Sequence, residues 1–207
     1  MHGEGVMHGD IKGVGLSTPN LSFVSLNFIF KANILINKHG HACLADFSLT
    51  VIAPDPAFSS TSSSKAAGMT RWMSPERLDP TQFNVKDSRP TNESDCYALG
   101  MVVLEVLSGD VPFTRDCNEL MVMQKVLEGE RPARPQGVGG AWFTDDLWEM
   151  LQVCWSPKPK DRPAVDAVLE CLMQILTVCQ PLPPSIDDNF RIHSDGELCF
   201  TVSEVSR

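Results

Sequence analysis

The sequence is poor in basic residues and contains no long apolar run. It has 17 lysines and arginines against 26 aspartates and glutamates, a formal net charge of -9. A chain this acidic offers no electrostatic surface for nucleic acid or for an anionic membrane. The most apolar stretch near the start, Leu21 to Phe30, is too short to span a bilayer. We therefore expect neither nucleic acid nor a membrane among its partners.

Two further absences bear on where the protein works. The first residues, MHGEGVMHGD, lack the basic and apolar regions of a signal peptide. The seven cysteines form no CxxC pair and no zinc-binding spacing, and an odd number cannot all pair with one another. Both features favour reduced thiols inside the cell, so we predict a cytoplasmic location, with the nucleus left open. The length of 207 residues and the 43% of hydrophobic residues suit one globular domain with a tail.

The first third of the chain predicts two strands and a loop. The apolar run Ile34 to Lys38, the turn His39-Gly40 and the segment His41 to Ala45 together predict a hairpin. The segment Ala53 to Ala67 contains two prolines and six consecutive serine or threonine residues, Ser59 to Ser64. This composition predicts a flexible loop.

Two helices are expected after that loop. Asp95 to Ser108 is apolar on nearly every face, which is typical of a buried helix, and Glu105 is its only charge after Asp95. Gly109 stands where the helix C-cap would fall. The segment Glu119 to Glu128 predicts a second helix. Its apolar side is expected to consist of Leu120, Met123 and Leu127.

Two more helices are expected toward the C-terminus. Thr144 can cap one of them, with acidic residues in its first turn, and Pro163 fits the first turn of the other. The stripe of the first is Leu147, Met150, Leu151 and Cys154, and the apolar face of the second is Val165, Val168, Leu169, Leu172, Ile175 and Leu176. From Gln180 onward the chain is rich in proline and aspartate without periodicity, which predicts a tail.

Six short motifs follow one another along the chain. In order they are His8-Gly9-Asp10-Ile11-Lys12, Asn33-Ile34-Leu35, Asp46-Phe47-Ser48, Met73-Ser74-Pro75-Glu76, Asp95 to Gly100, and Asp161-Arg162-Pro163. Each has an ordinary interpretation when taken alone, such as a surface ion pair, a turn or a helix N-terminus. Their order and spacing resemble the protein kinase signature from the catalytic loop to the end of the domain. The RWMSPE and SDCYALG segments are most similar to tyrosine-kinase-like serine/threonine kinases, and His-Gly-Asp to fungal families of that kind.

The resemblance implies an α+β fold of a particular kind. It is the mostly helical C-terminal lobe of a kinase domain, with a short β-hairpin and with the N-terminal lobe absent. Residues 1–179 would form this partial kinase domain, and residues 180–207 a flexible tail. The implied activity is transfer of the γ-phosphate of ATP to serine or threonine hydroxyls of protein substrates, with ATP and Mg²⁺ as cofactors.

The resemblance also assigns roles in catalysis. Asp10 matches the catalytic aspartate, which accepts the proton of the substrate hydroxyl, and Lys12 would neutralise charge on the transferred phosphoryl group. Asn33 and Asp46 match the two magnesium ligands, and hard oxygen ligands suit that ion. Leu35 matches the residue that packs under the adenine.

Other motif residues are implied to be structural. Glu76 and Arg162 match the pair that ties the activation segment to the helical lobe. Asp95 would hold the backbone of the catalytic loop through hydrogen bonds. His8 is interpreted as a packing residue rather than a ligand.

The sequence departs from the family pattern in its length. The Gly-rich loop, the strand lysine and its glutamate partner do not occur before the catalytic loop. Asn33 follows Asp10 by 23 residues, whereas the family pattern has five. Deleting Val14 to Lys31 restores that spacing, so we interpret residues 14–31 as a non-native insert such as a retained intron. A loop of this length closes at a small entropic cost, and it could bulge out and leave both residues in place.

Three single residues depart from the pattern as well. Gly9 stands where most kinases carry an arginine that grips a phosphorylated activation loop. Ser48 replaces a glycine, which narrows the backbone choices there. Met69 stands where serine/threonine kinases usually have a threonine that contacts the catalytic aspartate, and Thr70 is expected to point elsewhere.

Three interpretations stay open from the sequence. The gene product is an active protein kinase, or a pseudokinase or scaffold that presents a partner surface around Glu119 to Gly140, or a truncated product without a stable fold. The first is favoured because Asp10, Lys12, Asn33 and Asp46 are all present. The chain as written, without an N-terminal lobe, is expected to be inactive.

Overall fold

The computed structural model describes residues 2–13, 33–36, 42–52, 69–114, 118–137, 139–178, 190–192 and 198–200. Its helices are α1 (Pro75–Leu78), α2 (Asn92–Ser108), α3 (Glu119–Leu127), α4 (Asp145–Cys154) and α5 (Val165–Val178), with the short 3₁₀ turns η1 (His2–Glu4), η4 (Phe47–Leu49), η5 (Thr70–Trp72), η6 (Gly139–Trp142) and η7 (Pro159–Asp161). Its strands are β1 (Val6–Met7), β2 (Ile34–Ile36), β3 (Ala42–Leu44), β4 (Val51–Ile52), β5 (Phe190–Ile192) and β6 (Leu198–Phe200).

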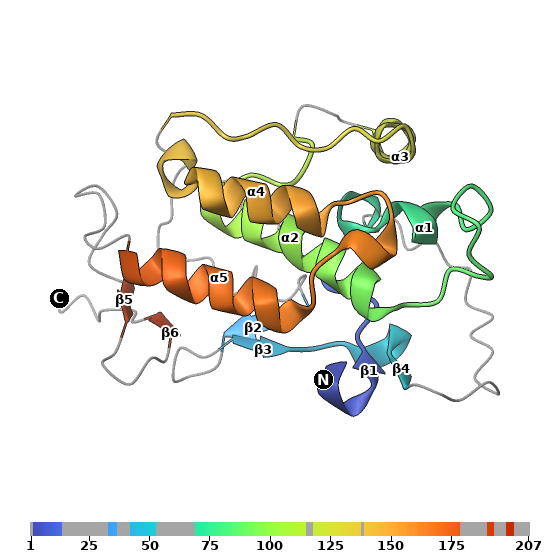
Figure 1. Ribbon diagram of the computed structural model, residues 1–207, viewed down its shortest axis with the longest axis horizontal. Helices are drawn as coiled ribbons and strands as arrows, with labels where there is room; N and C mark the ends of the chain where they lie inside the picture. Colours follow the sequence, from blue (N-terminus) through green and yellow to red (C-terminus); the bar gives the residue numbers. More distant parts are fainter. Residues whose placement is uncertain are drawn as a thin grey trace, which may run out of the picture.

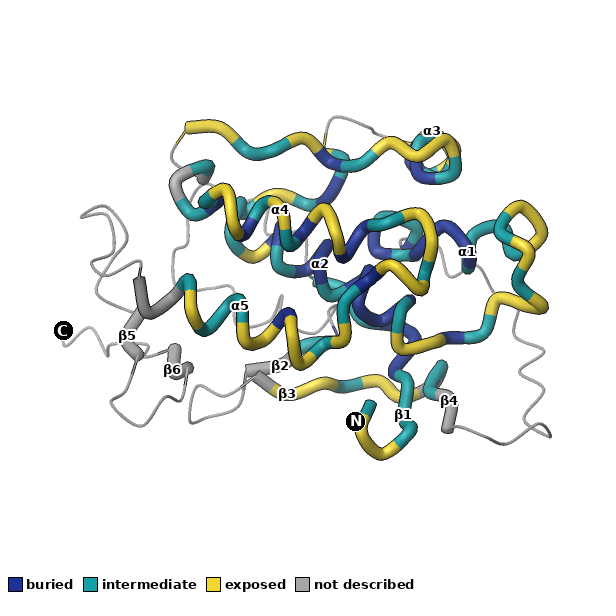
Figure 2. Tube along the Cα trace, in the orientation of Figure 1, coloured by how far each residue is buried: buried dark blue, intermediate teal, exposed yellow. Residues whose placement is uncertain are grey.

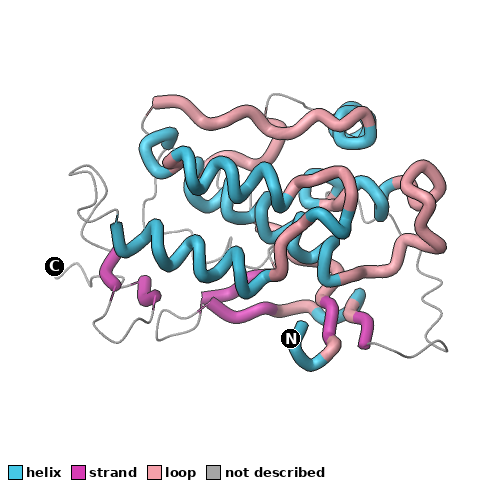
Figure 3. The backbone as a smooth tube through the Cα atoms, viewed as in Figure 1, coloured by secondary structure: helices cyan, strands magenta, loops and turns pink. Residues whose placement is uncertain are grey.

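The helices form the body of the molecule, and the strands border it. Figure 1 shows α2 through the middle, with α4 alongside it and α5 below α4 in that view. The pairs β2–β3 and β1–β4 lie along the edge of the body near the N-terminus. Figure 3 shows how much of the described chain is helical and how short the strands are. The predicted mostly helical body with a few strands is therefore confirmed. No helix in the described ranges is long and apolar enough to cross a membrane.

The predicted hairpin is present as an antiparallel pair. Ile34 lies opposite Leu44, Leu35 opposite Cys43 and Ile36 opposite Ala42. The turn expected between the two strands lies outside the described residues. A second antiparallel pair joins Val6 and Met7 of β1 to Ile52 and Val51 of β4. Because β1 leads directly into the His8 motif, this pairing brings that motif next to the segment that follows the hairpin.

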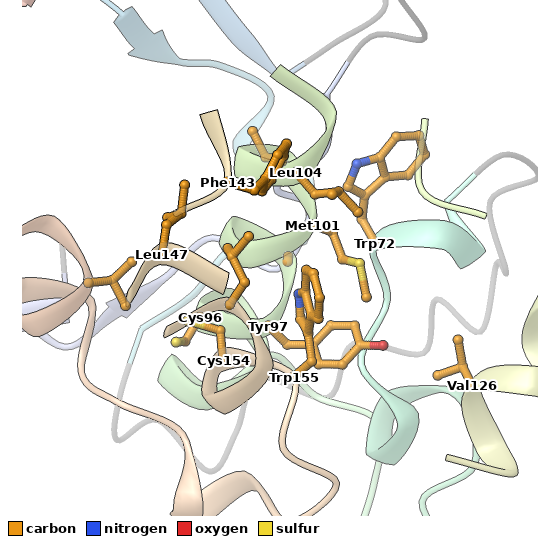
Figure 4. Packing of buried hydrophobic residues seen from close by; sticks show 14 of the residues in the cluster. Trp72, Cys96, Tyr97, Met101, Leu104, Val126, Phe143, Leu147, Cys154 and Trp155 are labelled. Carbon is orange, nitrogen blue, oxygen red and sulfur yellow. The ribbon is translucent and has the colours of Figure 1, made fainter. Parts of the chain in front are cut away.

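Helix α2 forms the centre of the hydrophobic core. Figure 2 shows that buried residues concentrate along α2 and the segments that cross it. Figure 4 shows side chains from α2, α4 and the η5 region packed together around Tyr97 and Met101. The buried cluster consists of Trp72, Cys96, Tyr97, Ala98, Met101, Val102, Leu104, Val122, Val126, Phe143, Leu147, Leu151, Cys154, Trp155 and Val168. The predicted burial of α2 on nearly every face is confirmed, and Gly109 ends the helix with φ 77°.

The start of α2 is fixed by a capping box. The Thr91 side chain accepts a hydrogen bond from the Ser94 amide, 3.1 Å, and Ser94 Oγ accepts one from the Thr91 amide, 2.8 Å. These two bonds satisfy backbone donors that a helix N-terminus leaves without partners. The helix therefore begins three residues before the predicted Asp95.

Replacing Thr91 by alanine tests this cap. We expect the free energy of unfolding to fall by about 1 kcal/mol, because alanine offers no oxygen to the Ser94 amide. Thr91→Ser is the matched control, since serine caps at least as well and should leave stability unchanged. Urea unfolding of the three proteins measures the difference. An equal loss in both variants would contradict the role of the cap.

The predicted buried face of α3 is wrong in part. Leu120, expected on that face, is 68% exposed, whereas Val122 and Val126 are buried. The reason lies outside the helix, because α3 packs against η5 and α1, and these neighbours decide which side is covered. The apolar residues of α3 surround much of the helix, so periodicity alone could not choose between the sides.

The last long helix also differs from the prediction. It begins at Val165 rather than at Pro163, and Leu169, expected on the buried face, is 55% exposed. Arg162 is extended, with φ -82° and ψ 145°. The Val168 amide donates to the Ala164 carbonyl oxygen at 3.3 Å, so Ala164 rather than Arg162 is the residue that precedes the helix. The stripe Leu147, Leu151 and Cys154 of α4 is buried as predicted, and Thr144 caps that helix through the Leu147 amide, 3.3 Å.

Several predicted segments fall on parts of the chain that are not described. The expected loop at residues 53–67 and the whole of the expected insert at residues 14–31 lie outside the described residues. Within the expected tail, β5 and β6 pair antiparallel, with Phe190 opposite Phe200. The sequence analysis did not predict that pair.

Candidate active site

The loop that carries Asp10 is anchored to the core by a buried carboxylate. Asp95, in the first turn of α2, accepts hydrogen bonds from the His8 amide at 2.7 Å and the Gly9 amide at 2.9 Å. His2 Nε2 lies 3.1 Å from the same carboxylate. Asp95 is only 1% exposed, so these amides replace the water it has lost. This is the contact that the family resemblance implied for Asp95.

His8 joins the loop to the segment after β3. Its ring is fully buried, and its Nδ1 accepts a hydrogen bond from the Asp10 amide, 3.2 Å. With Nδ1 accepting, the proton lies on Nε2, which donates to the Ala45 carbonyl oxygen at 3.0 Å. The Phe47 ring stands 4.9 Å from the His8 ring, centroid to centroid. His8 therefore holds two chain segments together, as expected for a packing residue.

Asp10, Lys12 and Asn33 meet at one point. Asn33 Nδ2 donates to the Asp10 backbone oxygen at 2.7 Å and to Asp10 Oδ2 at 2.6 Å. Lys12 Nζ lies 3.2 Å from the same Oδ2. Asp10 and Asn33 are 7% and 6% exposed, so both are buried. The contact is present although 22 residues separate the two in the sequence, so the long spacing does not keep them apart.

Leu35 and Asp46 lie on the hairpin next to this cluster. Leu35 occupies the middle of β2, opposite Cys43 of β3. Asp46 follows β3 and is exposed, with φ 58°, a left-handed conformation that few non-glycine residues adopt. The Ala45 amide donates to the Asn33 backbone oxygen at 2.8 Å. Asp46 is the next residue after Ala45, so this backbone hydrogen bond brings it close to Asn33.

A small cavity opens beside the Asp10 carboxylate. Its walls include Gly9, Asp10, Lys12, Met69, Ser74 and Arg77. Asp10 Oδ1 and Ser74 Oγ are both buried and have no hydrogen-bond partner among the described residues. Buried polar atoms are nearly always paired, so two such atoms beside one cavity indicate a place for a polar group. Thr70, by contrast, points away and donates to Glu119 Oε2 at 2.8 Å, as predicted.

A buried ion pair fixes α1 to the segment between η7 and α5. Arg162 donates through Nη1 to Glu76 Oε1 and through Nη2 to Glu76 Oε2, each at 2.7 Å. Arg162 also donates to the carbonyl oxygens of Ser156 at 2.9 Å and Glu93 at 3.0 Å. Its guanidinium carbon lies 5.1 Å from the centre of the Tyr97 ring. This is the pair that the sequence resemblance implied.

Burial raises the pKa of two side chains of α2, Glu105 and Tyr97. The pKa of Glu105 rises to about 7 because burial disfavours its charged form, although a hydrogen bond from Trp72 Nε1 opposes the shift. The pKa of Tyr97, the only tyrosine of the chain, rises to about 12, also through burial. In the sequence Glu105 is the lone charge within an apolar helix after Asp95, and this pattern could have indicated a buried carboxyl group with a raised pKa.

One further residue of the site was missed. Arg77, in the short helix α1, lines the cavity and donates through Nη1 to the Gly9 carbonyl oxygen at 2.5 Å. It belongs to no motif, and its partner lies 68 residues away in sequence. A four-residue helix has no periodicity that could have marked it.

Comparison with known proteins identifies the family. Residues 28–172 match the sequence model of the family described as protein tyrosine and serine/threonine kinase. The chain therefore belongs to the protein kinase family. Residues 1–27, which include Asp10 and Lys12, lie outside that match.

The relatives are all much longer proteins. The chain is 30% identical over 151 residues to a probable serine/threonine-protein kinase of Dictyostelium discoideum, covering 73% of the chain and 14% of that protein. It is 31% identical over 139 residues to the dual specificity mitogen-activated protein kinase kinase mek-1 of Caenorhabditis elegans. This match covers 67% of the chain and 36% of that protein. It is also 29% identical over 180 residues to a light-sensor protein kinase of Ceratodon purpureus. This match covers 83% of the chain and 13% of that protein. The chain thus spans only a minor part of each of these relatives.

Protein kinases as a family use ATP and Mg²⁺, and the site has donors that fit the metal. The Asn33 amide nitrogen is turned toward Asp10, which leaves the oxygen of the same amide to coordinate. The Asp46 carboxylate is the second hard oxygen donor, on the adjoining strand end. Mg²⁺ commonly takes one or two protein oxygens and receives the rest from phosphates and water.

Proposed function

We propose that this chain carries the catalytic loop of a protein serine/threonine kinase of the tyrosine-kinase-like group. The observation that carries the proposal is the Asp10 Oδ1 oxygen, which is buried beside the cavity and has no hydrogen-bond partner among the described residues. An acceptor held in this way suits a hydroxyl that must give up its proton. The other carboxylate oxygen, Oδ2, is already held by Asn33 and Lys12.

The proposed mechanism assigns a separate task to each group. Bound ATP and Mg²⁺ supply the phosphoryl group and the charge that neutralises it. Asn33 and Asp46 would hold the metal through their side-chain oxygens. Asp10 Oδ1 orients the substrate hydroxyl and accepts its proton, and Lys12 places a positive charge where negative charge accumulates. Catalysis of this kind depends mostly on positioning and electrostatic stabilisation.

The choice of serine and threonine as acceptors rests on two observations. Lys12 follows Asp10 by two residues, as in the serine/threonine pattern. The Dictyostelium discoideum relative is also described as a probable serine/threonine-protein kinase. Met69 instead of threonine at the cavity wall departs from the pattern, and it presents a thioether where other members present a hydroxyl.

An assay of phosphate transfer to serine and threonine peptides tests the proposal. It should be run with Mg²⁺ and ATP on the chain itself and on the full product of its gene. Where transfer occurs, Asp10→Asn should lower the rate by at least about a hundredfold, because the amide cannot accept the hydroxyl proton. Asp110→Asn, on the exposed turn after α2, is the matched control and should not change the rate.

The alternative function gives a different result. A pseudokinase or scaffold would bind nucleotide or a partner protein, and neither the chain nor the full product would transfer phosphate. Transfer that survives Asp10→Asn would remove Asp10 from the mechanism while leaving a kinase activity to explain.

A further inference from the structure

Position 9, directly before the catalytic aspartate, has no room for a side chain. Gly9 has φ 78°, in the region where residues other than glycine are strained. A Cβ atom added there would stand 2.3 Å from Pro90 Cγ and 2.9 Å from the Leu49 backbone oxygen. Both distances are too short for real contacts, and one of them involves backbone that cannot move aside cheaply. A cationic side chain therefore cannot come from position 9 itself.

Arg77 brings a cation to this place from α1. Its Nη1 donates to the Gly9 carbonyl oxygen at 2.5 Å, and its Nε donates to the Ser88 carbonyl oxygen at 3.1 Å. The Gly9 carbonyl belongs to the peptide group that leads into Asp10. A charged donor to this carbonyl fixes the orientation of that peptide more firmly than a neutral one. The two bonds also connect the loop to the segment that leads into α2.

The Arg77 guanidinium that contacts the Gly9 carbonyl oxygen is largely removed from water. Burial lowers the pKa of Arg77, which reflects the cost of removing the guanidinium from water, while the charges of Asp95, Asp10 and Glu76 oppose that shift. Glu76 is already bound bidentately by Arg162, and Asp95 by the His8 and Gly9 amides. Arg77 accordingly donates to backbone oxygens on two segments, at Ser88 and Gly9, rather than to these carboxylates.

We propose that Arg77 is a positioning residue for Asp10, which it holds through the Gly9 carbonyl so that Asp10 Oδ1 faces the cavity. The catalytic part of this proposal rests on the kinase function proposed above, whereas the structural part does not. In this scheme Arg77 contacts neither ATP nor Mg²⁺, since Asn33 and Asp46 would hold the metal. Its loss should therefore affect the rate of transfer and leave the affinity for ATP unchanged.

Arg77→Ala is the test variant, with two measurements on the full chain. Amide hydrogen exchange of the His8 to Lys12 segment should become faster by about fivefold or more, because the loop loses one of its anchors. Where transfer is measurable, kcat should fall by about tenfold while KM for ATP changes by less than about twofold. Arg89→Ala is the matched control, because Arg89 pairs with Asp87 on the exposed surface, and it should change neither quantity.

Chemical rescue separates positioning from a general loss of structure. Millimolar guanidinium ion should restore part of the protection and of kcat in Arg77→Ala, and the same concentration of urea should not. Arg77→Lys, which keeps the charge without the planar pair of donors, should fall between the wild type and Arg77→Ala.

Each contrary result has a distinct meaning. Unchanged exchange in the His8 to Lys12 segment of Arg77→Ala overturns the proposal, whether or not the protein transfers phosphate. Faster exchange with unaltered kcat overturns the catalytic part. Absence of transfer by the full product of the gene, with faster exchange in the variant, refutes the kinase function and supports the anchoring of the loop by Arg77.

Discussion

Arg162→Met is expected to lower the free energy of unfolding by about 3–5 kcal/mol, because it leaves the buried Glu76 carboxylate without its bidentate partner. The Arg162 side chain is 0% exposed and that of Glu76 is 5% exposed, so water cannot easily replace the lost bonds. The substitution also removes the donors to the Ser156 and Glu93 carbonyl oxygens. Urea unfolding, followed by circular dichroism, measures the loss.

Two further variants separate the ion pair from the packing around it. In Glu76→Gln/Arg162→Met the charge on both sides is gone, so the double variant should lose less than the sum of the single losses. Arg89→Met removes an arginine from a pair on the surface, where such pairs contribute about 0–1 kcal/mol. A loss in Arg162→Met no larger than in Arg89→Met would mean that the buried pair does not hold the two segments together.

The elements predicted correctly are those whose signals are local. Thr144 before two aspartates and Gly109 after an apolar run mark helix ends through backbone hydrogen bonds and left-handed conformation, which neighbouring residues decide. The β2–β3 hairpin follows from two short apolar runs and a turn between them. In each case the physical cause lies within a few residues of the signal.

The errors occur where distant contacts decide the outcome. Leu120 was assigned to the buried side of α3, but η5 and α1 cover the side that carries Val122 and Val126. Leu169 was assigned to the buried face of α5 and is exposed. Periodicity describes a helix relative to its own axis, and it contains no information on where the neighbouring elements lie.

The candidate site shows the same division. Resemblance to the kinase family named both members of the Glu76–Arg162 pair, which are 86 residues apart, although no local pattern could have joined them. It likewise named Asp95 as the anchor of the loop, and the contacts are present, while the catalytic roles stay predictions. Arg77 belongs to no family motif, so only the three-dimensional contact with Gly9 reveals it.

Glu105 should make the protein less stable as the pH rises through the range from about 4.5 to about 7. Its carboxyl group is 1% exposed, and Oε1 has no hydrogen-bond partner among the described residues. Trp72 Nε1 donates a hydrogen bond to the other oxygen, Oε2, at 2.9 Å. Burial raises the pKa from 4.5 to about 7. The folded protein then keeps a proton that the unfolded chain has already released, so stability is lost across this range and levels off above it.

The size of the effect follows from the same two pKa values. The difference between 4.5 and about 7 corresponds to a loss of about 3 kcal/mol between the protonated and the fully ionised folded protein. Glu105→Gln cannot ionise and keeps an oxygen that accepts from Trp72. This variant should match the wild type near the acidic end of the range and exceed it by up to about 3 kcal/mol at pH 8.

Unfolding free energies measured from pH 5 to pH 8 test whether Glu105 causes the pH dependence of stability. Glu149→Gln, on the exposed side of α4, shows what the same loss of charge does at the surface, and its difference from the wild type should stay small across the range. If Glu105→Gln keeps the slope of the wild type between pH 5 and pH 7, another group titrates there. If the slope disappears, Glu105 links proton binding to the contact between α2 and Trp72. Glu105 also lies against the segment that follows Lys12, because a Cβ atom added to Gly13 would stand 2.0 Å from Glu105 Oε2. Protonation of this carboxyl would then act on the packing against Gly13.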